Sequence, residues 1–139
     1  MPLSASKLKV GDTHTAKLVD DLKRTQIVQY AGSSGDYNPL HTDEPFAVAS
    51  GYPSVFAHGM LTMGMTGKML TDYVGDARLT KYGVRFTSQV FPGDSLEATA
   101  TVKEILERDG MKLVALDVST KNQNGVEVVS GYAEARVDA

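Results

Sequence analysis

The chain has 139 residues, no cysteine and a formal net charge of −3 at pH 7. Compact domains most often have about 100–150 residues, so the whole chain, residues 1–139, is expected to form one domain. The lack of cysteine excludes disulfides, thiolate metal ligands and thiol nucleophiles, and the mildly acidic balance with scattered basic residues argues against a nucleic-acid partner.

The first half of the chain is predicted to be mostly helical. A short strand is expected around residues 14–19, and a helix begins near Thr25, with Gly32 placed to end it. Residues 43–45, Asp-Glu-Pro, are typical of a helix start, because proline is tolerated in the first turn. The Gly-Tyr-Pro sequence at residues 51–53 should end that short helix.

The longest apolar region, residues 55–74, is predicted to be a buried helix that begins near His58. Its apolar side chains lie around most of the circumference, so we expect neighbours on several sides. Lys68 and Asp72 interrupt the region, which does not suit a membrane span. The first twelve residues lack the apolar segment of a secretory signal. We therefore expect a cytoplasmic protein without a membrane partner.

From Tyr82 onward, apolar side chains alternate with polar ones, which is typical of half-buried strands. Residues 92–94, 108–110 and 124–125 carry the Gly, Asp and Asn of hairpin turns. At least four antiparallel strands are therefore expected. Packed against the long helix, they predict an α+β fold.

Two short motifs contain two of the three histidines of the chain. The first, SGDYNPLH at residues 34–41, places Asp36 and His41 on one loop that an intervening proline can hold rigid. The second, AHGM at residues 57–60, is typical of a helix N-terminus, where the Gly59 amide could polarise a carbonyl. A carboxylate, an imidazole and such an amide together indicate acid–base chemistry on a carbonyl compound.

Simpler interpretations of these residues stay open at this point. Asp36 can belong to an ordinary turn, and His41 can serve only as a structural hydrogen-bond donor. For the imidazole of His58 we favour the role of a helix cap. His14 lies in an edge-like strand and is expected at the surface.

Metal, covalent and nucleotide chemistry have less support. A metal site of Asp36, His41 and His58 is conceivable, but the spacing matches no familiar ligand set, so we expect none. Ser34 and Thr62 have no activating base nearby in the sequence, which disfavours a covalent intermediate. No glycine-rich phosphate loop is present, so we expect no nucleotide cofactor.

The run YAGSSGDYNPLH at residues 30–41, followed by FAHGMLTMG at residues 56–64, resembles the hydratase-2 motif of the MaoC-like dehydratase family. Residues 73–76 and 82–87 are similar to the catalytic B-type subunit of actinobacterial (3R)-hydroxyacyl-carrier-protein dehydratases. The resemblance implies a hot-dog fold, in which an antiparallel sheet wraps a long helix. It also implies a homodimer, or a heterodimer with a related hot-dog subunit, that binds an acyl thioester of CoA or acyl carrier protein near the interface.

The same resemblance implies that Asp36 and His41 are the catalytic pair and that the Gly59 amide is the oxyanion donor. The residues expected to support them are Ser34, Asn38 and His58. Many (R)-specific enoyl-CoA hydratases carry a serine on the central helix, where this chain has Gly67. We therefore transfer no third catalytic side chain, and Thr62 and Thr66 are only weak substitutes.

The expected reaction is the reversible syn addition of water across a trans-2-enoyl thioester, which gives the (3R)-hydroxyacyl product without metal or cofactor. Asp36 and His41 would hold one water molecule, and either group can be the acid and the other the base. Two alternatives compete with this hypothesis. One is a non-catalytic hot-dog partner subunit, against which the intact set of Asp36, Asn38 and His41 argues, and the other is an acyl-CoA thioesterase.

Overall fold

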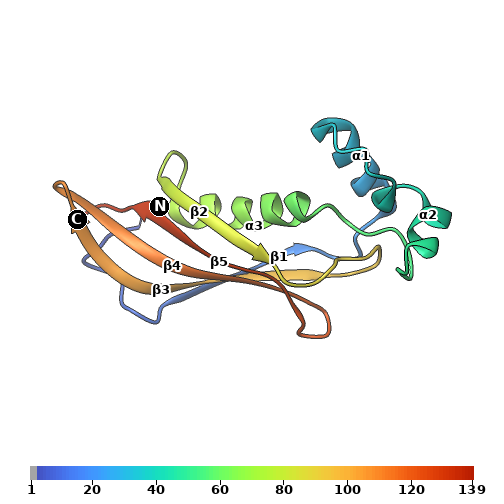
Figure 1. Cartoon of the computed structure of the whole chain (residues 1–139). Helices are drawn as coiled ribbons and strands as arrows, with labels where there is room; N and C mark the ends of the chain where they lie inside the picture. Colours follow the sequence, from blue (N-terminus) through green and yellow to red (C-terminus); the bar gives the residue numbers. More distant parts are fainter. Residues whose placement is uncertain (1–2) are drawn as a thin grey trace.

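The computed structural model describes residues 3–139 and shows an antiparallel sheet curved around a long helix (Figure 1). The strands are β1 (Thr13–Val19), β2 (Leu79–Phe86), β3 (Leu96–Arg108), β4 (Met111–Asn122) and β5 (Glu127–Arg136). They lie in the order β1-β3-β4-β5-β2, and every neighbouring pair is antiparallel. β1 and β2 are therefore the edges of the sheet.

The helices lie in two places relative to the sheet. They are α1 (Arg24–Ser34), α2 (Glu44–Ala49) and α3 (Gly59–Val74), with a 3₁₀ turn, η1 (Pro39–His41), between α1 and α2. Figure 1 shows α3 lying along the concave face of the sheet, while α1 and α2 project beyond one end of it. The loops that connect α1, η1, α2 and α3 consequently gather near the first turn of α3.

The main core fills the space between α3 and the sheet. The inward-facing residues of β3 and β4 alternate with outward-facing ones, as the period of two in the sequence predicts. The buried members of this core include Leu70 and Val74 of α3 and Ala98, Ala100, Val102, Val114 and Leu116 of the strands. Fully burying one such large aliphatic side chain contributes about 1.5–3 kcal/mol, so this layer holds α3 on the sheet.

A second core anchors the projecting helices. Its buried members are Leu22, Ile27, Ala57, Val90, Leu96, Val128 and Val129. Because these residues come from α1 and the loop before it, from the segment before α3, from the loop between β2 and β3, and from the starts of β3 and β5, they fix the start of α3 relative to α1. None of the α-helices within residues 3–139 is long and apolar enough to cross a membrane.

The local signals for helix ends are confirmed at α2 and corrected at α1. The Asp43 side chain caps α2 by accepting a hydrogen bond from the Phe46 amide at 3.3 Å. The predicted end of α1 at Gly32 is wrong, because the helix continues to Ser34 and ends at Gly35. Gly35 has a φ of 75°, which is the left-handed conformation that favours glycine, whereas Gly32 stays helical.

The hairpin predictions are confirmed at two of the three turns. Asp109 and Gly110 connect β3 to β4 with φ values of 54° and 78°, and the turn at residues 124–125 connects β4 to β5. The turn at residues 92–94 is not a hairpin, because the strands it connects, β2 and β3, are not neighbours in the sheet. Its residues specify the local turn, whereas packing against β5 decides where β2 pairs.

Two expectations about exposure are also corrected. The buried residues of α3 are Thr62, Thr66, Met69, Leu70 and Val74. They lie on one side of the helix, and Met60 on another side is 56% exposed, so this chain alone does not cover α3 on several sides. His14 is half-buried rather than on the surface, because the inner face of β1 turns it toward α3, where its ring stacks on Tyr73 at 4.5 Å.

Candidate active site

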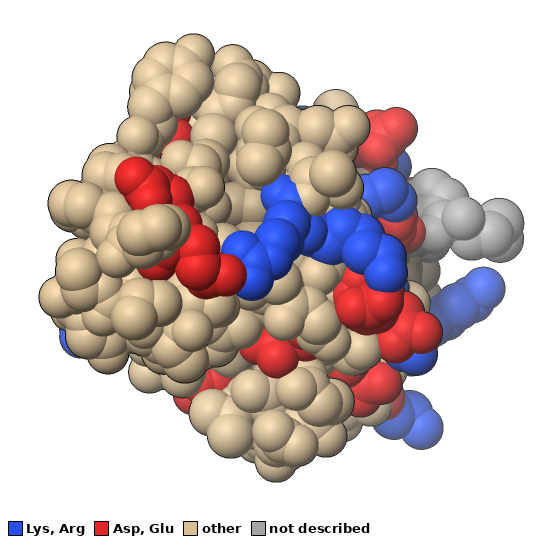
Figure 2. Space-filling view, turned by 90° about the vertical axis from the view of Figure 1, so that its right-hand side faces the viewer, with Lys and Arg blue, Asp and Glu red and all other residues tan. Residues whose placement is uncertain are grey.

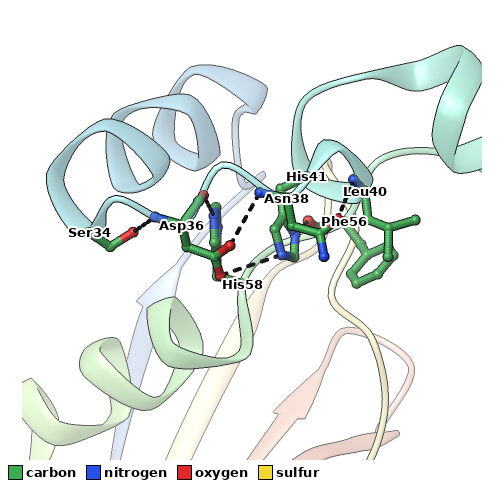
Figure 3. Close-up of polar contacts among 7 residues, drawn as sticks. All are labelled: Ser34, Asp36, Asn38, Leu40, His41, Phe56 and His58. Atoms are coloured by element: carbon green, nitrogen blue, oxygen red, sulfur yellow. Dashed lines mark hydrogen bonds and ion pairs between the residues drawn. The ribbon is translucent and has the colours of Figure 1, made fainter.

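The loop from α1 to η1 is held by its own polar side chains. The hydroxyl of Ser34 accepts a hydrogen bond from the Asp36 amide at 3.2 Å, and Asp36 Oδ1 accepts one from the Asn38 amide at 3.3 Å. Asn38 Oδ1 in turn accepts a hydrogen bond from the Leu40 amide at 3.0 Å, which caps η1 (Figure 3). These short-range bonds explain why a loop of this sequence can hold Asp36 and His41 in fixed positions.

Asp36 and His41 lie with their reactive atoms facing each other. His41 is only 9% exposed, and its Nδ1 lies 2.6 Å from the main-chain oxygen of Phe56. Since a carbonyl only accepts, Nδ1 carries a proton, and in the neutral ring Nε2 is the nitrogen with the free lone pair. That Nε2 lies 4.0 Å from Asp36 Oδ2, and the Asp36 side chain is 52% exposed (Figure 3). The pair can therefore share one small molecule that comes from solvent.

His58 lies directly behind this pair. It is 2% exposed, its ring stacks on the ring of His41 at 3.8 Å and 25°, and its Nε2 donates to the main-chain oxygen of Asp36 at 3.0 Å. Burial lowers the pKa of His58, against the opposing effect of the Asp36 carbonyl, and a charge on His41 would lower it further. His58 is the N-cap residue of α3, but the interpretation of its imidazole as the capping group is wrong, because the side chain makes no capping bond to the helix.

The same three side chains place possible ligand atoms within 4.8 Å of one another. However, the rings of His41 and His58 stack nearly face to face, so their nitrogen lone pairs do not converge on one point. One nitrogen of each ring is already bonded to a main-chain oxygen. Metal ions such as Zn²⁺ need nitrogen ligands that point to a common centre about 2 Å away. The geometry suits acid–base chemistry better than metal binding.

The first turn of α3 supplies amide groups and borders a cavity. Gly59 is the first residue of α3, where backbone N–H groups have no partner within the helix and the helix dipole is positive. A cavity of about 290 Å³ lies beside it. Its lining residues are Phe56, Ala57, Gly59, Thr62, Phe86, Thr87, Ser88, Gln89, Val90, Val128 and Val129. Phe56, whose carbonyl binds His41, is one of these lining residues, whereas Asp36 and His41 themselves are not.

Sequence reasoning missed two residues that shape this region. Phe56 precedes the AHGM motif and holds His41 through its carbonyl, a contact that no side-chain pattern signals. Phe86 reaches Gly59 from the end of β2, which is a long-range contact. Thr62 lines the cavity, whereas the hydroxyl of Thr66 is bonded to Thr120 in the core at 2.7 Å and does not reach the site.

Figure 2 shows the end of the molecule from which α1 and α2 project. Most of this face is uncharged, and its basic and acidic side chains lie next to each other. One ion pair of this kind joins Arg24 of α1 to Glu44 of α2 at 2.6 Å. Glu44 also accepts a hydrogen bond from the Val55 amide, which ties α2 to the segment leading into α3.

Comparison with known proteins identifies relatives along most of the chain. Residues 6–124 match the family described as "MaoC like domain". The enoyl-CoA hydratase ChsH3 of Mycobacterium tuberculosis is 40% identical over 100 residues, which are 70% of this chain and 32% of that protein. A mitochondrial 3-hydroxyacyl-[acyl-carrier-protein] dehydratase of Arabidopsis thaliana is 32% identical over 135 residues, which are 95% of this chain and 79% of that protein. The chain thus spans about a third of the length of ChsH3.

The likeness extends to solved structures. The R-hydratase PhaJ1 from Pseudomonas aeruginosa superposes with a TM-score of 0.83 and 27% identity, over 99% of this chain and 86% of that one. The expected hot-dog fold is thereby confirmed.

Proposed function

The chain belongs to the MaoC-like domain family, and from this premise we propose that it is an (R)-specific hydratase/dehydratase, a hydro-lyase that interconverts trans-2-enoyl and (3R)-hydroxyacyl thioesters. Relatives named enoyl-CoA hydratase and 3-hydroxyacyl-[acyl-carrier-protein] dehydratase support the reaction and a thioester of CoA or acyl carrier protein as substrate. The observation that carries the proposal is the convergence of His41 Nε2 and Asp36 Oδ2 at 4.0 Å.

This separation allows both groups to hold one water molecule. In hydration, the water oxygen bonds to C3 of the enoyl chain, and its proton passes to the free Nε2 of His41. The electron pair of the C2–C3 double bond shifts toward the thioester carbonyl, and C2 then takes a proton from the pair formed by Asp36 and His41. The pair gains one proton and returns one from the same side, which gives syn addition. Proton transfer by positioned side chains contributes about 10²–10⁴ in rate.

The negative charge that develops on the thioester oxygen needs a donor nearby. We assign this role to the amide of Gly59, because it lies at the positive end of α3 and borders the cavity beside the pair. Removing one such donor typically costs about 10²–10³ in rate. The apolar walls of the cavity, which include Val90, Val128 and Val129, suit the acyl chain.

We also propose that the chain works as a dimer with a second hot-dog subunit. The edge strand β2 leaves one row of backbone groups unpaired, and Met60 near the site is 56% exposed. Sedimentation at micromolar concentration should give twice the chain mass of 14.9 kDa for a homodimer. A measured mass equal to that of one chain would rule out self-association and point to a related subunit as the partner.

One assay separates the proposed reaction from the competing functions. The purified chain is incubated with crotonyl-CoA while the enoyl absorbance and the release of free thiol are followed in parallel. A hydratase lowers the enoyl absorbance without releasing thiol, and chiral analysis of the product should give the (3R) isomer. Release of thiol would identify a thioesterase, and the absence of both signals would leave a non-catalytic partner subunit.

A further inference from the structure

His58 lies at the centre of a column of rings that crosses the site. It meets the Tyr30 ring of α1 at 4.8 Å and stacks on the His41 ring at 3.8 Å. His41 in turn meets the ring of Phe56 edge-on at 5.3 Å. The plane of the His41 ring is thus set from one side by His58 and from the other by Phe56.

His58 also contacts the second member of the pair. Its Nε2–H donates to the main-chain oxygen of Asp36 at 3.0 Å, across 22 residues of sequence (Figure 3). No other side-chain hydrogen bond found in residues 3–139 reaches the Asp36 main chain from outside its own loop. Since the His58 side chain is almost fully buried at 2% exposure, it does not meet a substrate that enters from solvent.

We propose that His58 is a positioning residue of this acid–base pair: its Nε2–H fixes the backbone of Asp36, while its ring packs against the ring of His41. This inference rests on the proposed function, because it assigns the residue that keeps Asp36 Oδ2 and His41 Nε2 within reach of one water molecule. Without this contact, the half-exposed Asp36 depends only on bonds within its own loop.

The environment of Nδ1, the other ring nitrogen of His58, indicates that this position needs the Nε2–H donor. Nδ1 of His58 is buried and has no hydrogen-bond partner. A buried polar atom without a partner costs about 1–3 kcal/mol, and an apolar residue of similar size would avoid that cost. A histidine is therefore a poor choice for packing alone and a reasonable one if Nε2–H is required. Burial lowers the pKa of His58, so the ring stays neutral and adds no charge beside His41.

Two substitutions separate the hydrogen bond from the packing. In His58→Gln the amide nitrogen is as many bonds from Cα as Nε2 is, so the bond to the Asp36 carbonyl is kept while the ring is lost. In His58→Phe the ring is kept and the donor is lost. His14→Phe is the matched control, because His14 also stacks on an aromatic ring, that of Tyr73, but lies on β1.

The experiment measures kcat and KM for hydration of crotonyl-CoA by the parent and the three variants, with thermal melts of each. We expect His58→Phe to lose about 10–10² in kcat with little change in KM, because a displacement of about 1 Å at a reacting group costs on this order. His58→Gln should recover most of that loss, and His14→Phe should match the parent. If the Tm of His58→Phe collapses, His58→Met provides a second replacement without a donor.

The inference is overturned if His58→Phe turns over like the parent, or if His58→Gln falls as far as His58→Phe. An inactive parent would instead refute the proposed function. In that case ¹⁵N NMR of the histidine rings decides the role of His58 without any substrate. The inference requires a neutral ring protonated at Nε2 at about pH 7, above the ordinary histidine pKa. A charged ring, or one protonated at Nδ1, contradicts it.

Discussion

Replacing Gly59 with alanine adds one methyl group at the first residue of α3, beside the cavity. The new Cβ would lie 3.0 Å from two ring carbons of Phe86 and 3.1 Å from a third. Ordinary carbon contacts are about 3.5–4.0 Å, so the ring must move by about 0.5 Å. Phe86 can do so, because it is 51% exposed and ends the edge strand β2.

The effect of this substitution on stability should be small. Replacing glycine with alanine in a helix gains up to about 1 kcal/mol, and the displaced ring costs a similar amount. We therefore expect a net change within about 1 kcal/mol, which corresponds to a few degrees in Tm. The activity should respond more strongly, since the methyl group and the shifted Phe86 ring both lie where the thioester must approach the Gly59 amide. A fall of about 10–10² in kcat/KM is expected.

Gly64→Ala is the control for this prediction. Gly64 lies on the exposed side of the same helix, and a Cβ there would meet nothing within 4 Å. This variant should gain up to about 1 kcal/mol in stability and keep the parental kcat/KM. The comparison measures kcat/KM for hydration of crotonyl-CoA and the Tm of both variants. Parental activity in a folded Gly59→Ala protein would refute the assignment of the cavity and the amide.

Three further predictions concern the pair and the core. His41→Asn places an amide nitrogen where Nδ1 lies, so the variant keeps the hydrogen-bond donor to the Phe56 carbonyl and loses the base. The protein should fold, and its kcat/KM in the crotonyl-CoA assay should fall by about 10²–10⁴. The folded-state pKa of His58 is lowered by burial, so as the pH falls through about 6.5 the unfolded chain takes up the proton first. The stability that neutral His58 contributes is therefore full above about pH 6.5 and is lost as the pH falls toward the folded pKa. Thermal melts from pH 8 to pH 5 should accordingly show a larger loss of Tm for the parent than for His58→Gln. Thr120→Val removes the buried partner of the Thr66 hydroxyl and should cost about 1–3 kcal/mol in urea unfolding; unchanged stability would show that this 2.7 Å bond contributes nothing.

Signals carried by neighbouring residues allowed much of the fold to be predicted from sequence. Asp43 and Pro45 mark the start of α2 because a cap and a first-turn proline act within a few residues. The Asp109-Gly110 turn specifies its hairpin for the same reason, since both residues adopt positive φ. The position of β2 next to β5 could not be predicted in this way. It depends on contacts between segments about 50 residues apart, and the turn at residues 92–94 is compatible with either neighbour.

In the candidate site, too, local features could be predicted from sequence and long-range contacts could not. The loop that carries Asp36 and His41 could be predicted because its bonds are local and its motif is specific. His58 was expected to support the pair, but its hydrogen bond to Asp36 could not be predicted, because the partner is a main-chain oxygen 22 residues away. A histidine before a helix has the same local pattern whether it caps that helix or turns its side chain elsewhere. Phe86 was missed because only the folded sheet brings it to Gly59.

The most direct test of the proposed chemistry compares kcat/KM for crotonyl-CoA hydration in Asp36→Asn and Asp72→Asn. The first substitution keeps the size of the side chain and removes its charge, and the pair with His41 at 4.0 Å is too exposed for its loss to unfold the protein. Asp72 forms a surface ion pair with Lys68 at 2.7 Å on α3 and is the matched control. We predict a loss of about 10²–10⁴ for Asp36→Asn and parental activity for Asp72→Asn. Parental hydration by Asp36→Asn would contradict the proposal that a carboxylate and an imidazole act together on one water molecule.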